Sequence, residues 1–138
     1  MTDKIQNPHI QTLCQLAEED ESTLQFPLPD QIFGFHAQQS CEKLFKALIA
    51  ANGKAYPFTH SLEKLADLLA DCHEALPDTP YDVLLLEPFA VQLRYDIGDS
   101  LPDEDKVAIR ESIVTLRLHV IQRILSLEGS AVSRPSGS

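Results

Sequence analysis

Residues 30–53 read DQIFGFHAQQSCEKLFKALIAANG, a stretch that predicts one long amphipathic helix. At about 100 degrees per residue, its apolar positions fall on one broad arc. These positions are Phe33, Ala37, Cys41, Leu44, Phe45, Leu48 and Ala51. The polar positions on the opposite side are His36, Gln39, Lys43 and Lys46. Asn52-Gly53 supplies the left-handed residue that commonly ends a helix. We therefore expect one side of this helix to lie in a core and the other to face water or a ligand.

Capping signals predict further helices on both sides of this one. Asn7-Pro8 places an N-cap before a proline at the first helical position, which opens a helix to about residue 19. A loop is expected over residues 20–29, because prolines near its end cannot continue a helix. Downstream, Thr59 or Ser61 caps a helix with leucines at three- and four-residue spacing, which runs to about residue 75.

Two more helices follow the same signals. Thr79-Pro80-Tyr81-Asp82 combines a capping threonine, a proline in the first turn and an acid three residues after the cap. This pattern predicts a helix to about residue 95, and Pro88 requires that it be kinked or begin again nearby. Ser100-Leu101-Pro102-Asp103 repeats the signature and opens a last helix, which Gly129 is expected to end.

The composition indicates one folded domain. The chain has 138 residues, of which 43% are apolar and 23% are charged, as in globular proteins. We expect an all-α fold, an up-and-down bundle of four to five helices over residues 1–128, followed by a mobile tail over residues 129–138. The three cysteines, Cys14, Cys41 and Cys72, lie far apart in the sequence and form no C-x-x-C pair. We therefore expect buried free thiols.

Charge and hydropathy limit what the protein binds. The formal net charge of −10 opposes non-specific attraction to nucleic acid or to anionic membranes. No stretch is apolar over the roughly 18 to 20 residues of a membrane-spanning helix, and the N-terminus lacks the pattern of a secretory signal. We expect a cytoplasmic protein with no membrane partner. To bind a phosphate, the protein would need to bring several of its few lysine and arginine side chains close together.

The motif FHAQQSCEKLFKAL at residues 35–48, with THSLEKL at residues 59–65, resembles the HEPN family. That family's pattern is a helix with H-A-Q-Q, E-K and L-K-A-L, followed by a short loop and T-H-x-L. Arg94-Tyr95 is similar to the family's R-Y pair near the end of a later helix. The resemblance implies an all-α bundle that forms a homodimer. It also implies a small nucleotidyltransferase as partner, in a toxin–antitoxin arrangement.

The resemblance leaves enzymatic activity open. Some family members are metal-independent ribonucleases whose motif is an arginine followed, after four to six residues, by a histidine. This chain has no such spacing, and its nearest pairs, formed by Arg110 or Arg117 with His119, lie on different helix faces. We expect little or no intrinsic ribonuclease turnover. No familiar hydrolase, kinase or metal-binding motif occurs, so neither a cofactor nor a metal is expected.

Candidate residues for binding nucleotide or RNA come from these same segments. They are His36, Gln39, Lys43, His60, Arg94 and Tyr95. Arginine and lysine suit a phosphate, a helix start favours anions, and a tyrosine ring stacks on a base. Each candidate has an ordinary alternative: a solvated helix face with Lys46 paired to Glu42, a histidine that fixes a turn, or an arginine that pairs with a carboxylate. The corresponding alternative function is a non-catalytic helical adaptor or protein-interaction module.

Overall fold

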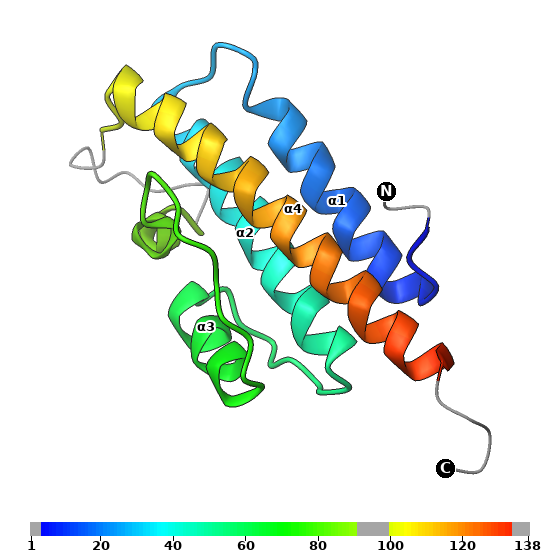
Figure 1. Ribbon diagram of the computed structural model, residues 1–138. Coiled ribbons are helices and arrows are strands. Elements are labelled where there is room, and N and C mark those ends of the chain that lie inside the picture. Colours follow the sequence, from blue (N-terminus) through cyan, green and yellow to red (C-terminus); the bar gives the residue numbers. More distant parts are fainter. Residues whose placement is uncertain (1–3, 91–99, 134–138) are drawn as a thin grey trace.

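The computed structural model describes residues 4–90 and 100–133, without the side chains of residues 131–133 (Figure 1). Its elements are α1 (Pro8–Thr23), α2 (Asp30–Ala51), α3 (Leu62–Asp71), the 3₁₀ helix η2 (Val83–Ala90) and α4 (Asp103–Ser133). These ranges contain no strand, so the all-α prediction is confirmed. None of the helices they contain has the length and apolar character needed to cross a bilayer.

α2 is the central helix of the bundle. It packs against α1, α3, η2 and α4 (Figure 1). α1 runs antiparallel to α2, whereas α4 runs parallel to it, because the chain returns through α3 and η2 before α4 begins (Figure 1). At the far end of α4, the Glu128 carboxylate accepts the backbone N–H groups of Gln6 and Asn7 at 2.8 and 3.1 Å. This contact joins the start of α1 to the end of α4.

The burial of α2 follows from its central position. The predicted apolar arc is in the core, with Phe33, Ala37, Cys41, Leu44, Phe45 and Leu48 all buried. The four predicted polar positions are half-buried and not fully solvated, and Gln38, Ser40 and Glu42, which flank the apolar arc, are buried. Ser40 Oγ donates to the carbonyl of Ala17 at 2.9 Å, which ties α2 to α1. The polar side of α2 is therefore an internal contact surface as well as an outer face.

The N-terminal end of α2 holds the chain on both sides of residues 91–99. Before this segment, Phe89 of η2 packs against Gly34, where an added Cβ would overlap the phenyl ring. Only glycine allows this close approach. After the segment, the N–H of Leu101 donates to Asp30 Oδ2 at 3.0 Å. The described residues Phe89 and Leu101 thus both contact the first turns of α2.

The prediction of a helix that begins at Thr79 is wrong. In this part of the described chain, the structure has the 3₁₀ helix η2, which begins at Val83. Thr79 Oγ1 donates to the carbonyl of Tyr81 at 2.7 Å and does not cap a helix. The N–H of Tyr81 donates to Ser112 Oγ of α4 at 2.9 Å. Asp82 takes the capping role, because its Oδ1 accepts the N–H of Leu84 at 3.0 Å. The predicted continuation to residue 95 lies outside the described residues.

Three predicted helix ends also differ from the structure. α1 continues past residue 19 to Thr23. α3 is capped by Ser61, as one alternative predicted, but ends before residue 75 because His73 adopts a positive φ of 61°. α4 continues through Gly129, which was expected to end it, as far as Ser133. A glycine in a helix interior costs only about 1 kcal/mol relative to alanine, so one glycine does not stop a long helix.

All three cysteines are free thiols, as expected. Cys14 and Cys41 are buried, whereas Cys72 is only half-buried. Burial raises the pKa of Cys14 and of Cys41 to about 12, and nearby glutamates add to the effect. These two thiols therefore stay protonated and unreactive at neutral pH.

Candidate functional site

Asp20, a buried residue of α1, binds two of the predicted ligand residues. His36 Nδ1 lies 2.9 Å from Asp20 Oδ1, and Lys43 Nζ pairs with Asp20 Oδ2. His36 and Lys43 are seven residues apart, so they lie on one face of α2. Both side chains are about one-quarter exposed, at 25% and 23%. The carboxylate of Asp20 therefore compensates the charge of Lys43 and fixes α2 against α1.

Glu42 binds the other predicted residues on this side of α2. Its Oε1 lies 3.0 Å from Gln38 Nε2, 3.0 Å from His60 Nδ1 and 3.4 Å from Gln39 Nε2. Its Oε2 lies 3.0 Å from Lys46 Nζ, which confirms the pairing expected under the ordinary alternative. Burial raises the pKa of Glu42, but hydrogen bonds from Gln38, Lys46 and His60 outweigh burial and hold it below its ordinary value. Glu42 is thus an ionised acceptor at the centre of a polar cluster.

The arginine and histidine of the ribonuclease-like pair do not converge. The Arg117 guanidinium binds Glu21 of α1, with Nε 2.7 Å from Oε1. His119 comes two residues after Arg117 on α4, so at about 100 degrees per residue the two side chains leave the helix about 160 degrees apart. General acid–base cleavage of RNA needs such groups to meet at one phosphate. These two residues do not provide that geometry.

Depressed carboxyl pKa values make the stability of the fold depend on acid pH. The pKa values of Asp30, Glu42, Glu74 and Glu87 all lie below their ordinary values. For Glu74, hydrogen bonds from Arg123 lower the pKa and burial opposes them. The unfolded chain therefore binds more protons than the folded chain as the pH falls, so the stabilisation is present above the ordinary pKa of 4.5 and is lost as the pH falls through the folded value.

We therefore expect the free energy of unfolding, measured in urea at a series of pH values, to decrease between about pH 5 and pH 3. Glu74→Gln should lower the stability at neutral pH and weaken the pH dependence, because the variant lacks the Glu74 carboxylate that titrates in this range. An exposed carboxylate gives the control, and Glu19→Gln should leave the profile unchanged. Stability that is flat or that rises on acidification would contradict the assignment.

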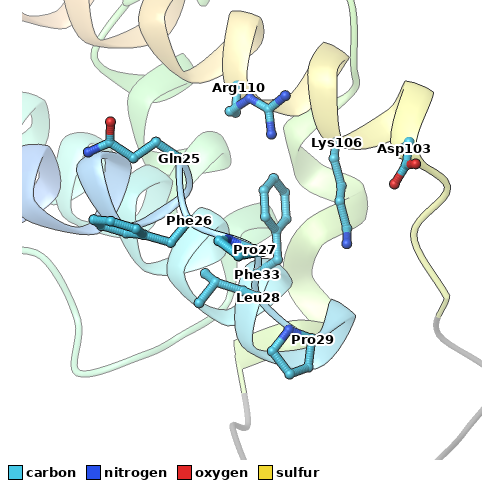
Figure 2. Close-up of a pocket in the computed structure, with 9 residues that line it drawn as sticks. All are labelled: Gln25, Phe26, Pro27, Leu28, Pro29, Phe33, Asp103, Lys106 and Arg110. Carbon is cyan, nitrogen blue, oxygen red and sulfur yellow. The ribbon is translucent and has the colours of Figure 1, made fainter.

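A cavity of about 580 Å³ lies where α2 and α4 begin (Figure 2). The loop between α1 and α2 forms one wall, and the first turns of α4 form the other. Its lining residues are Gln25, Phe26, Pro27, Leu28, Pro29, Phe33, Asp103, Lys106 and Arg110. Pro29 caps α2 without a side-chain hydrogen bond. The helix N-termini at this end already carry carboxylates, Asp30 in α2 and Asp103, Glu104 and Asp105 in α4, so an anionic ligand depends on the cations of the cavity.

Two cations of α4 flank the buried Phe33 ring in this cavity (Figure 2). Lys106 Nζ lies 5.4 Å from the ring centroid and the Arg110 guanidinium carbon lies 6.0 Å from it. Lys106 also pairs with Asp30 at 2.7 Å. Arg110 forms no ion pair with any carboxylate of residues 4–90 and 100–133. Within the described residues, Arg110 is thus a cation without a carboxylate partner at the edge of the cavity.

Comparison with known proteins identifies the family. The HEPN domain family model matches residues 31–124 of the chain. The chain belongs to the HEPN family. No curated protein and no solved structure gives a significant match. The matched range of the HEPN domain includes the polar side of α2 and the two cations of α4.

The structure of this HEPN domain groups the predicted site residues in two places. His36 and Lys43 lie at Asp20, while Gln39 and His60 lie at Glu42. The predicted residues Arg94 and Tyr95 lie outside the described residues. His60 is 64% exposed, so among the four it is the one with the most surface for a ligand.

Sequence reasoning missed the cavity cations of the HEPN domain. Lys106 and Arg110 are four residues apart at the start of the last helix, directly after an acidic first turn. That spacing places both side chains on one face, which is the signal that could have found them. Phe26 could be noted only as an aromatic residue in a proline-rich loop, because its 59% exposure is a property of the fold.

Proposed function

We propose that this chain is the HEPN subunit of a nucleotidyltransferase-linked, toxin–antitoxin-type system, and that it binds a nucleotide or RNA in the cavity at the start of α2 and α4. The single observation that carries the proposal is Arg110, a guanidinium that no carboxylate of the described residues pairs with, at a cavity of nucleotide size in a chain of net charge −10. An acidic protein can hold a phosphate only where a cation is both free and locally concentrated.

The chemistry of the cavity suits a ligand that joins a phosphate to a ring. Its volume of about 580 Å³ lies within the range of small-molecule sites. Arg110 can donate two parallel hydrogen bonds to phosphate oxygens, and Lys106 adds a second positive charge. Phe26 leaves 59% of its surface exposed, so its ring is available for stacking on a base. Phe33 is buried, and Lys106 and Arg110 form cation–π contacts with its ring.

The residues predicted from sequence form a second contact surface in this proposal. They are His36, Gln39, Lys43, His60, Arg94 and Tyr95. Asp20 and Glu42 already accept bonds from the first four, so we assign the phosphate to Lys106 and Arg110 and an orienting role to the others. Arg94 and Tyr95 lie outside the described residues. In the proposal, Arg94 contributes a guanidinium and Tyr95 a ring that can stack on a base.

Binding without cleavage is the proposed mode of action. The divergence of Arg117 and His119 favours it, because Arg117 binds Glu21 and the two side chains leave α4 in different directions. The proposal includes a homodimer, a cytoplasmic location and a small nucleotidyltransferase as partner. Co-expression with a nucleotidyltransferase encoded by the neighbouring gene, followed by gel filtration, tests the partnership. Separate elution of the two proteins would count against it and would favour an independent adaptor.

Replacing Arg110 should weaken nucleotide binding. We expect Arg110→Ala to reduce the affinity for AMP, measured by isothermal titration calorimetry, by about tenfold or more, because a charge-assisted hydrogen bond contributes about 1.5 to 3 kcal/mol. Arg110→Lys keeps the positive charge but loses the paired N–H donors of the guanidinium, so it should bind AMP with intermediate affinity.

The matched control removes one exposed positive charge far from the cavity. Lys54→Ala lies in the loop after α2 and should bind AMP as the parent protein does. If Arg110→Ala also binds like the parent, the cavity is not the phosphate site. If binding is instead lost in Lys43→Ala with the fold intact, the ligand lies on the polar side of α2.

A further inference from the structure

α4 carries apolar side chains on its outer side as well as toward the core. Its core side consists of Ile109, Ile113, Leu116, Val120 and Ile124, all buried. On another side, Val107, Val114 and Leu118 remain 45%, 38% and 45% exposed. Leu125 continues this line and is half-buried. At about 100 degrees per residue, these four side chains lie within about 20 degrees of one line along the helix.

We call Val107, Val114, Leu118 and Leu125 the α4 stripe. The steps between its members are seven, four and seven residues, which read the same in both directions along the helix. Steps of seven and four are those of a coiled-coil seam. A symmetric dimer contact requires that residue i meets residue j while j meets i. An antiparallel pair of stripes satisfies this requirement, with Val114 against Leu118 and Val107 against Leu125.

We infer that the α4 stripe is the surface on which a second copy of this chain binds, with the two α4 helices antiparallel. The inference rests on the homodimer proposed above and assigns its interface. The stripe is about 27 Å long at 1.5 Å rise per residue. A standard interface buries about 800 Å² on each partner. A stripe of three partly exposed side chains and one half-buried one is smaller than that. The dimer should therefore dissociate on dilution.

Charge gives a second expectation for this dimer. Each copy carries a net charge of −10, so two copies repel each other at low ionic strength. The stripe itself is apolar and loses nothing when salt screens this repulsion. Added sodium chloride should therefore strengthen the association, whereas a dimer held by ion pairs would weaken.

Cysteine cross-linking tests the register in the full-length protein. Cys72, which is half-buried, is first replaced by serine, and the remaining thiols are buried. With oxidised glutathione as the oxidant, we expect Val114→Cys/Leu118→Cys to form a covalent dimer, as should an equimolar mixture of the two single variants. Each single variant alone should cross-link little, because a disulfide needs Cα atoms within about 7 Å. Efficient cross-linking of Val114→Cys alone would overturn the antiparallel register.

Analytical ultracentrifugation separates this inference from the proposal it rests on. Leu118→Glu should shift a dimeric parent to monomer without lowering the melting temperature, since this side chain lies outside the core. Ser126→Glu adds the same charge on an exposed part of α4 about 100 degrees from the stripe, and it should remain dimeric. A dimer that survives Leu118→Glu overturns the interface alone. A parent that is monomeric at every concentration overturns both the interface and the proposed homodimer.

Discussion

Glu42→Ala is expected to reduce the free energy of unfolding by about 3 to 5 kcal/mol, because it removes one partner from a buried ion pair. The variant leaves Lys46, only 13% exposed, without its counterion. It also leaves Gln38, which is fully buried, with one acceptor fewer, although the carbonyl of His60 still accepts from Gln38 Nε2 at 3.0 Å. Urea denaturation followed by circular dichroism measures the loss directly.

A matched pair of variants separates the charge effect from the loss of volume. Glu42→Gln keeps the shape and an acceptor oxygen, so it should be destabilised less than Glu42→Ala. Glu19→Ala removes an exposed carboxylate from α1 and should stay within about 0.5 kcal/mol of the parent. A Glu42→Ala protein within about 1 kcal/mol of the parent would show that the polar cluster of α2 adds nothing to the fold.

Gly34→Ala should destabilise the protein by about 1 to 3 kcal/mol, the usual cost of overpacking a core. The added methyl group would overlap the Phe89 ring, and α2 and η2 would have to separate. Gly129→Ala makes the same chemical change in the same kind of helix, with no atom within 4 Å of the new Cβ. It should stabilise the protein by about 0.5 to 1 kcal/mol, because alanine loses less backbone entropy in a helix than glycine.

Thermal unfolding of the two glycine variants gives shifts of opposite sign under this account. The double variant Gly34→Ala/Phe89→Ala identifies the cause, since the penalty of the added methyl should shrink once the ring is absent. If Gly34→Ala is neutral, or if its penalty persists without the ring, the contact between η2 and α2 is misassigned.

Local signals predicted the helices well where the cap and the apolar spacing agreed. α2 begins and ends almost where its sequence indicates, and Ser61 caps α3. The segment after Thr79 misled because tertiary contacts overrode its local signature. The N–H of Tyr81 bonds to Ser112 of α4, a partner 31 residues away that no local pattern reveals.

The candidate site was harder to predict, because its properties depend on contacts between distant residues. His36 and Lys43 were recognised as one face of a helix, but their shared partner Asp20 comes from another helix. An acidic run is normally solvated, so nothing in the sequence marks Asp20 as buried. Likewise, Arg110 becomes distinctive only when the described part of the fold offers it no carboxylate partner. Arginine spacing along the chain cannot show that difference.

We propose that the ligand phosphate lies at Lys106 and Arg110, in the cavity where α2 and α4 begin. Nuclear magnetic resonance of the ¹⁵N-labelled protein, recorded during titration with AMP, tests this position most directly. We expect the largest amide shifts in residues 25–33 and 103–110, and we expect them to disappear in Arg110→Ala. Shifts confined to residues 56–60 and the neighbouring turns of α2, or no shifts at saturating AMP, would contradict it.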